Sequence, residues 1–223
     1  MQTWRLGGTN VRIEHWLGLC LLLGCKSKTP FPEGLAPLED NRATWPADGS
    51  ESIQTKLGTE AETDGGYTWG HARGYILRPI SDVYSALGRS RVSANRRSLT
   101  AYEVEDDVED YPHSYALHNR VEDIITVEFT ITWRHGALDG NESTPSEVGT
   151  RWQKTDGSDV IELQRGSVYT WAVNDSTTAL EFVLHQRSMA DDHDVIETYL
   201  DDYYADILAA AKGEDLPEYP SGL

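Results

Sequence analysis

The feature that most constrains the fold of this sequence is a run of alternating side chains between Val121 and Arg134. One side of the run is apolar except for Asp123, and the other side carries Glu122, Thr126, Glu128, Thr130, Thr132 and Arg134. The apolar side consists of Val121, Ile125, Val127, Phe129, Ile131 and Trp133. Successive side chains of a β-strand point to opposite faces, so this pattern predicts a half-buried strand of an antiparallel sheet.

Further strands are predicted on both sides of this run. Between Tyr67 and Leu77, long and small side chains alternate, although the pattern leaves open which face points inward. After a loop at 136–145, turn signals at Asp156-Gly157, at Gly166-Ser167 and at 174–176 separate short strand-like segments. These segments are 149–155, 160–165, 168–173 and 178–187. A meander of antiparallel strands follows from this order.

Two helices are expected, one after the first strand and one near the end of the chain. Pro79 suits a first helical turn, apolar residues recur at helical spacing from Ile80 to Leu87, and Gly88 ends the pattern. A longer pattern begins at Val195, after acidic N-cap candidates at 191–194, and ends at Gly213. Its broad aromatic stripe predicts a helix packed against the sheet.

The order of these elements, together with the segment from Gly74 to Leu87 (GYILRPISDVYSAL), resembles the START-like or SRPBCC superfamily, which includes polyketide cyclase-like and Bet v 1-like proteins. The resemblance covers 67–213 and leaves 214–223 as a tail. It implies an α+β helix-grip fold, in which a curved antiparallel sheet of about seven strands wraps around the long C-terminal helix, with a short helical region after the first strand. It also implies an apolar cavity between the sheet and that helix.

Aromatic residues are the candidates for lining such a cavity. They are Phe129, Trp133, Trp152, Trp171, Phe182, Tyr199 and Tyr203. The same side chains are equally suited to filling a core, and both interpretations stay open at this point. Phe129, Trp133, Tyr199 and Tyr203 are the first choices, because they lie on the expected inner strand face or on the helix stripe.

The N-terminus resembles a bacterial lipoprotein signal peptide. Basic residues precede an apolar run that ends at Gly24-Cys25, and this run is too short to span a bilayer as a helix. The Leu22-Leu23-Gly24-Cys25 segment is similar to the lipobox, in which the signal, here 1–24, is removed and the cysteine is acylated. The resemblance implies membrane attachment through Cys25 and a location in the bacterial cell envelope. Through the same resemblance, Lys26 after the cysteine implies the outer membrane, facing the periplasm.

The segment 25–66 is predicted to be a disordered tether. It is rich in proline and acids and has almost no apolar periodicity, so it offers little surface to bury. A chain of this length would hold the domain tens of ångströms from the membrane. Trp45 is the exception, because it is suited to packing back onto the domain.

Composition limits the partners and the cross-links. The net charge of −18 argues against nucleic acid and against attraction to anionic lipid head groups. The two cysteines are Cys20, inside the leader, and Cys25. No disulfide is then available to the processed chain, and its own core must hold it together.

The sequence contains no recognised catalytic or metal-binding motif, so no catalytic residue, metal or cofactor is expected. The histidines lack paired ligand spacing, and nucleophile elbows and phosphate loops are absent. The acidic stretch from Glu103 to Asp110 lacks the pattern of a calcium loop and is interpreted as a solvated connection. Asp123 is either a buried carboxylate or, by the favoured interpretation, a strand-end residue in water.

Three functions are compatible with these observations. The first is a lipid-anchored module that binds or carries a hydrophobic small molecule or lipid. The second is a cyclase- or hydrolase-like enzyme that uses Asp123 or a histidine in the cavity. The third is a structural envelope protein with a filled core that acts through its acidic surface. The contents of the cavity distinguish them.

Overall fold

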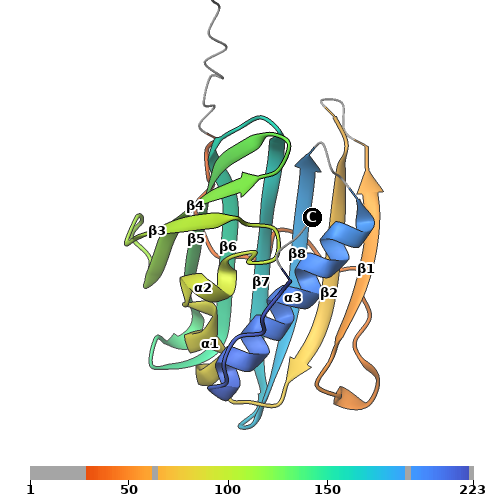
Figure 1. Ribbon diagram of the computed structural model, residues 1–223. Helices are drawn as coiled ribbons and strands as arrows, with labels where there is room; N and C mark the ends of the chain where they lie inside the picture. The colour runs from red at the N-terminus through yellow and green to blue at the C-terminus, as the bar shows by residue number, and fades with distance from the viewer. Residues whose placement is uncertain (1–28, 62–64, 189–191, 221–223) are drawn as a thin grey trace, which may run out of the picture.

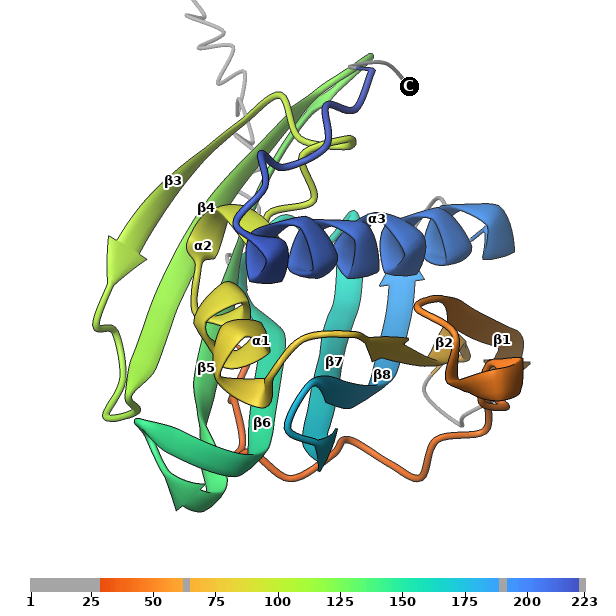
Figure 2. The same ribbon diagram turned by 90° about the horizontal axis from the view of Figure 1, so that it is seen from below.

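The structure is a computed structural model that describes residues 29–61, 65–188 and 192–220. Among these residues, eight strands form one antiparallel sheet in the order β1-β2-β8-β7-β6-β5-β4-β3, and the sheet curves around a long helix (Figures 1 and 2). The strands are β1 (Ile53–Glu60), β2 (Tyr67–Ile76), β3 (Ala101–Asp106), β4 (His113–Glu122), β5 (Thr126–Asn141), β6 (Thr144–Gly157), β7 (Ile161–Asn174) and β8 (Thr177–Ser188). The helices are η1 (Ala47–Gly49), α1 (Ile80–Leu87), α2 (Ser90–Ser93) and α3 (His193–Lys212). The predicted α+β helix-grip fold is confirmed.

The strand boundaries differ from the prediction in several places. Most of the predicted loop at 136–145 is strand, because β5 continues to Asn141 and β6 begins at Thr144. The alternating run is not one strand, because it contains the end of β4, a turn at 123–125 and the start of β5. The predicted turn at Gly166-Ser167 is also wrong, since β7 continues through it. Gly166 is needed there for close packing, because a Cβ at this position would lie 2.1 Å from Trp152 Cζ2. The turn predicted at Asp156-Gly157 lies slightly later, at 158–160, because β6 continues to Gly157, whereas the turn predicted at 174–176 is confirmed.

Both main helices begin and end as the sequence predicts. Pro79 precedes α1 and Gly88 follows it. The Asp192 carboxylate caps α3 by accepting a hydrogen bond from the Asp194 backbone N–H, and Gly213 ends the helix in the left-handed conformation, with a φ of 71°.

The small side chains of β2 allow α3 to approach the sheet closely. A Cβ on Gly70 would lie 2.4 Å from Ile196 Cγ2 and 2.8 Å from Leu200 Cδ1, both on α3. The long side chains of β2, Trp69 and His71 among them, therefore face away from the helix. The sequence left open which face of β2 points inward, and the space that the helix needs determines it.

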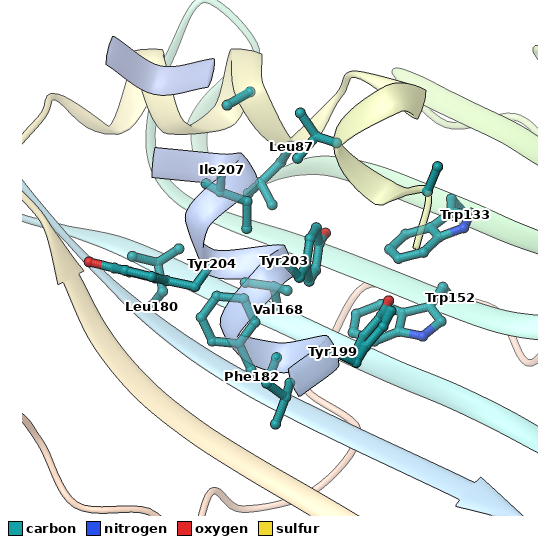
Figure 3. Close-up of a cluster of buried hydrophobic side chains, with 14 of the residues drawn as sticks. Leu87, Trp133, Trp152, Val168, Leu180, Phe182, Tyr199, Tyr203, Tyr204 and Ile207 are labelled. Atoms are coloured by element: carbon teal, nitrogen blue, oxygen red, sulfur yellow. The ribbon is translucent and has the colours of Figure 1, made fainter. Parts of the chain in front are cut away.

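A core of aromatic and aliphatic side chains fills much of the space between the sheet and α3. Figure 3 shows Trp133 and Trp152 side by side on neighbouring strands, with Tyr203 directed at them from the helix. The two indole rings are stacked with their centroids 4.7 Å apart, and both side chains are completely buried. Burial of this much aromatic surface is the main source of stability in a fold of this kind.

The interpretation of 25–66 as a disordered tether, with the domain starting at 67, is corrected for the described residues. β1 pairs with β2 over its whole length, so it belongs to the sheet. Residues 29–46, here called the N-terminal strap, cross the face of the sheet that lies opposite α3 (Figure 2). Trp45 packs back as expected, stacked on Tyr75 with ring centroids 4.9 Å apart. Residues 25–28 and 62–64 lie outside the described residues.

The strap has no apolar periodicity because its backbone makes many of its contacts. The Arg134 guanidinium donates to the carbonyls of Phe31 and Pro32, and the Gln153 amide donates to the carbonyl of Pro30. The Leu38 N–H in turn donates to Ser167 Oγ. Proline-rich chain is suited to such a position, since these contacts use carbonyls, which proline retains.

The acidic stretch and the tail also differ from the prediction. The stretch from Glu103 to Asp110 is not only a connection, because its first half lies in β3, which pairs with β4 at the edge of the sheet. This strand and β1 bring the sheet to eight strands instead of about seven. In the predicted tail, the Tyr219 hydroxyl donates to the Asp206 carboxylate, and so anchors the chain beyond α3.

Candidate functional site

An apolar pocket of about 220 Å³ lies between the first half of α3 and one end of the sheet. Its walls are the chain at 93–99, β4, β5, β7, β8 and the start of α3. The lining residues are Ser93, Asn95, Ser98, Leu99, Leu117, Asn119, Val121, Val127, Phe129, Ile131, Val160, Ile161, Gln164, Gln186, Ser188, Val195 and Tyr199. This pocket lies between the sheet and the long helix, where the sequence resemblance implies a cavity.

The pocket exists because α3 contacts one half of the sheet more closely than the other. The helix packs against β1, β2 and β8, while β4 and β5 curve away from it (Figure 2). Alternation along β4 places Leu117, Asn119 and Val121 on the wall that this separation exposes, and β5 contributes Phe129 and Ile131 beside them.

The lining combines aliphatic walls with uncharged polar groups. Among the described lining residues none carries a charged side chain, and the polar groups are amides and hydroxyls. Asn119 is 4% exposed; its amide nitrogen donates to the Leu117 carbonyl, and its Oδ1 has no hydrogen-bond partner among the described residues. A buried acceptor of this kind favours a hydrogen-bond donor on whatever occupies the pocket.

A chain of buried polar side chains runs from the core to the pocket wall. Thr150 Oγ1 lies 3.0 Å from His135 Nδ1, His135 Nε2 lies 3.0 Å from the Tyr115 hydroxyl, and that hydroxyl lies 2.6 Å from Ser93 Oγ. Burial lowers the pKa of His135 to about 3, so its imidazole is neutral at physiological pH. Burial also raises the pKa of Tyr115. The chain therefore orients the Ser93 hydroxyl with uncharged partners.

The structure separates the seven predicted cavity residues into three groups. Phe129 and Tyr199 line the pocket. Trp133, Trp152, Phe182 and Tyr203 are buried in the adjoining core. Trp171 lies on the opposite face of the sheet, where its ring meets Trp45 edge-on. The sequence interpretation missed most of the pocket because it did not recognise β4, although Leu117, Asn119 and Val121 already show the alternation of a strand.

The other residues singled out from the sequence do not meet at this pocket. Asp123 is exposed in the β4–β5 turn, as the favoured interpretation expected. The described acidic side chains of 103–107 are also exposed. Cys25 and the leader 1–24 lie outside the described residues. A larger hollow of about 440 Å³ beside β3 and β4 includes the charged side chains of Glu103, Arg120 and Glu128, so it is less suited to an apolar ligand.

Beneath the strap, Glu39 meets two buried histidines that the sequence did not bring together. Glu39 Oε1 lies 2.8 Å from His71 Nε2 and 3.4 Å from His185 Nε2. Burial lowers the pKa of His71 to about 4 and that of His185 to about 3, and in both cases the nearby Arg42 guanidinium adds to the effect.

The partners of these histidines argue against a metal ion between the three side chains. His71 Nδ1 accepts a hydrogen bond from the Arg42 backbone N–H, and His185 Nδ1 accepts one from the Arg165 guanidinium. The proton of each neutral ring therefore sits on Nε2, which is the nitrogen that a metal would need as a free ligand. Glu39 Oε1 and the two Nε2 atoms form no hydrogen bond among the described residues, and their close contact joins the strap to the sheet.

This chain is similar to known proteins in structure, but no similarity is found in sequence. No family model matches the sequence, and no curated protein matches it. None of the described helices is long and apolar enough to cross a membrane.

Solved structures do share its fold. The STAR-related lipid transfer protein from Xanthomonas axonopodis (fragment 25–204) matches with a TM-score of 0.53 and 12% identity, over 76% of this chain and 97% of that one. Human StAR-related lipid transfer protein 5 matches with a TM-score of 0.50 and 10% identity, over 77% and 86% of the two chains. The chain therefore has the helix-grip fold of the START-like proteins, with a pocket between its sheet and its C-terminal helix.

Proposed function

We propose that this protein binds or carries a hydrophobic small molecule in the pocket between α3, β4 and β5. The observation that carries the proposal is the pocket itself, an apolar space of about 220 Å³ where a solid core would leave none. The names of the two matched proteins add support, because both are described as lipid transfer proteins. The volume lies below the roughly 300–1,000 Å³ of drug-sized ligand sites, which favours a small or slender ligand.

The ligand is proposed to be uncharged and to carry at least one hydrogen-bond donor. A buried carboxylate or phosphate would lose its hydration and find no cation on the described lining. A hydroxyl or amide group would instead meet Asn119, Gln164 and the neighbouring serines. This reasoning favours a neutral amphipathic molecule, such as a long-chain alcohol, over a fatty acid.

The proposal includes an anchored location in the bacterial envelope. Its support is the sequence of the leader and of Leu22-Leu23-Gly24-Cys25, which resembles a lipobox. Acylation at Cys25 would attach the domain to a membrane despite its net charge of −18, and the outer membrane facing the periplasm is the proposed site. Replacing Cys25 with serine tests this, because unchanged retention in the membrane fraction would count against acylation.

Binding is tested with the neutral dye Nile red, whose fluorescence rises in apolar surroundings. Val127 lines the pocket, so Val127→Trp should fill it and weaken dye binding at least tenfold. Val173 is 51% exposed and is not part of the lining, and Val173→Trp serves as the matched control. A wild-type protein that takes up no dye and carries no small molecule in native mass spectrometry would contradict the proposal.

Competition distinguishes a neutral from an anionic ligand. At pH 8, 1-decanol should displace Nile red at much lower concentration than decanoate, because only decanoate would bury a charge. Asn119→Leu should weaken the competition by decanol while it retains the dye. Equal competition by the two molecules would refute the preference for an uncharged ligand.

The cyclase- or hydrolase-like alternative rests on one observation, the chain from His135 through Tyr115 to Ser93. Turnover of p-nitrophenyl butyrate that is lost in Ser93→Ala, but retained in Ser98→Ala, would support it. His135 is a weak base there because its pKa is lowered to about 3. The alternative of a structural protein with a filled core is disfavoured by the open pocket.

A further inference from the structure

We propose that the end of the domain where the pocket opens is the face that lies on a lipid bilayer, with the β4–β5 turn inserted among the lipids. The turn exposes two neighbouring isoleucines: Ile124 is 95% exposed and Ile125 is 54% exposed. Turns usually consist of glycine, proline, asparagine, aspartate or serine, so two isoleucines at a tip do not serve the turn itself. Apolar side chains in such a position suit an apolar partner.

The turn continues into the wall of the pocket. Val121 and Val127 pair directly across the two strands below the turn, and both line the pocket. Burial decreases along β4 toward this end: Leu117, deeper in the pocket, is 1% exposed, whereas Val121, next to the turn, is partly exposed. The pocket therefore opens beside the isoleucines, and an apolar path connects its interior with the tip.

The N-terminus of the described chain lies at the same end. The Thr29 N–H donates to the Thr155 carbonyl at 2.9 Å, two residues before β6 ends at Gly157. Gly157 in turn pairs with Phe129 of the pocket wall. Figure 1 shows the described chain starting at the end of the molecule where β8 terminates.

This position sets a short reach for the proposed lipid anchor. Cys25 precedes Thr29 by four residues, which span at most about 14 Å when fully extended. An acylated Cys25 would thus hold this end of the domain against the membrane, and not tens of ångströms away. This step rests on the anchor in the proposed function, whereas the exposed isoleucines and the pocket opening do not.

The charges near the turn indicate which bilayer it suits. Glu122, Asp123 and Glu128 are exposed around the tip, and Arg120 is the nearby cation. These acids would be repelled by anionic head groups, so the surface fits a zwitterionic bilayer.

Photocrosslinking tests the orientation with the full chain. The protein is reconstituted in phosphatidylcholine vesicles that contain a phosphatidylcholine with a diazirine on its acyl chain, and the crosslinked peptides are mapped by mass spectrometry. Crosslinks should concentrate in 121–127, 158–161 and 193–196. The double variant Ile124→Ser/Ile125→Ser should reduce the crosslinks in 158–161 and 193–196 at least fivefold.

The matched control uses exposed apolar residues at the opposite end of the sheet. Leu77 is 50% exposed and Val173 is 51% exposed, and Leu77→Ser/Val173→Ser should leave the crosslinks unchanged. Crosslinks spread evenly over the domain, or gathered near Leu77 and Val173, would overturn the proposal. So would a pattern that Cys25→Ser abolishes and the isoleucine variant leaves intact, since the anchor alone would then place the domain.

Nile red binding in solution separates this proposal from the pocket function. The isoleucine variant should bind the dye as the wild type does, because Ile124 and Ile125 do not line the pocket. A wild type that binds no dye but gives the expected crosslinks would refute the pocket function and support the membrane face. Normal dye binding with no crosslinks at the turn would do the reverse.

Discussion

Between pH 7.5 and pH 5.0 this protein should lose stability, and replacing His135 with glutamine should make that loss smaller by about 2 kcal/mol. His135 is fully buried, with its ring stacked on Tyr115 and Trp133 and both nitrogens near hydroxyl groups. Burial lowers its pKa to about 3 from the ordinary 6.5. The unfolded chain therefore takes up the proton first as the pH falls, and stability that is present above pH 6.5 is lost progressively toward pH 3.

The size of the effect follows from the difference between the two pKa values. At pH 5 the protonated form of an unfolded histidine with a pKa of 6.5 is more stable than the neutral form by about 2 kcal/mol. The folded His135 remains neutral at this pH, so the unfolded state alone gains this free energy. His71 and His185, whose pKa values are also lowered, add losses of similar size. Three such losses sum to about 6 kcal/mol, which is comparable with the whole stability of many domains.

Urea unfolding at pH 7.5 and pH 5.0 measures this directly. His135→Gln should lower stability at pH 7.5 through lost packing, but its further loss on going to pH 5.0 should be smaller than that of the wild type by about 2 kcal/mol. Val168→Ala, at a buried position with no ionisable group, is the control and should lower stability by the same amount at both pH values. If His135→Gln loses as much stability as the wild type between the two pH values, the reasoning about burial is wrong.

Three further changes test other parts of the fold. Gly166→Ala should lower stability by about 2 kcal/mol, seen as a lower thermal midpoint, because its Cβ would lie 2.1 Å from Trp152 Cζ2; an unchanged midpoint would refute the close packing. Arg96→Met should cost about 3 kcal/mol at pH 7.5 in urea unfolding, since Arg96 contacts the buried Asp206 carboxylate at 2.6 Å. That cost should shrink relative to the wild type at pH 5.0, because burial already raises the pKa of Asp206 and protonation removes the unpaired charge; a cost that grows at pH 5.0 would contradict this. Glu39→Gln should loosen the strap and so raise the rate of trypsin cleavage after Arg42 several-fold. Glu60 is the more exposed partner of Arg42, and Glu60→Gln should change this rate little. Equal cleavage rates in the two variants would count against the role of Glu39.

Much of the fold was predictable because its signals are local. Alternation in β2, the Pro79 start of α1 and the acidic cap and glycine end of α3 are each contained within one element. The turn between β4 and β5 was missed for a local reason as well. Ile125 lies in phase with Val121 and Val127, so the two strands resemble one alternating run, although Asp123 and Ile124 break the pattern at the turn itself.

The strap and most of the pocket could not be predicted in this way. The strap is held by side chains from distant strands, such as Arg134 and Gln153, which donate to its carbonyls, and no pattern within the strap records those donors. The pocket depends on how far α3 stands from β4, which is set by the small residues of β2 on the opposite half of the sheet. Phe129 and Tyr199 could be chosen as candidates because they are aromatic residues on the expected faces. Asn119 is a polar residue, and nothing in the sequence pattern distinguishes it as part of a pocket.

The position of β2 between β1 and β8 has a consequence for how the chain reaches its native state. β2 pairs with β8 in a register that joins Thr68 to Gln186, so one of the first strands to be synthesised takes its central partner from the last. Contacts of such long sequence separation are entropically costly to form and slow folding. One edge of β2 therefore stays unpaired until β8 has been synthesised and has docked. This holds during translation and in any partly folded intermediate. During that interval the edge is open to pairing with another chain, and helper proteins that shield nascent strands would act there.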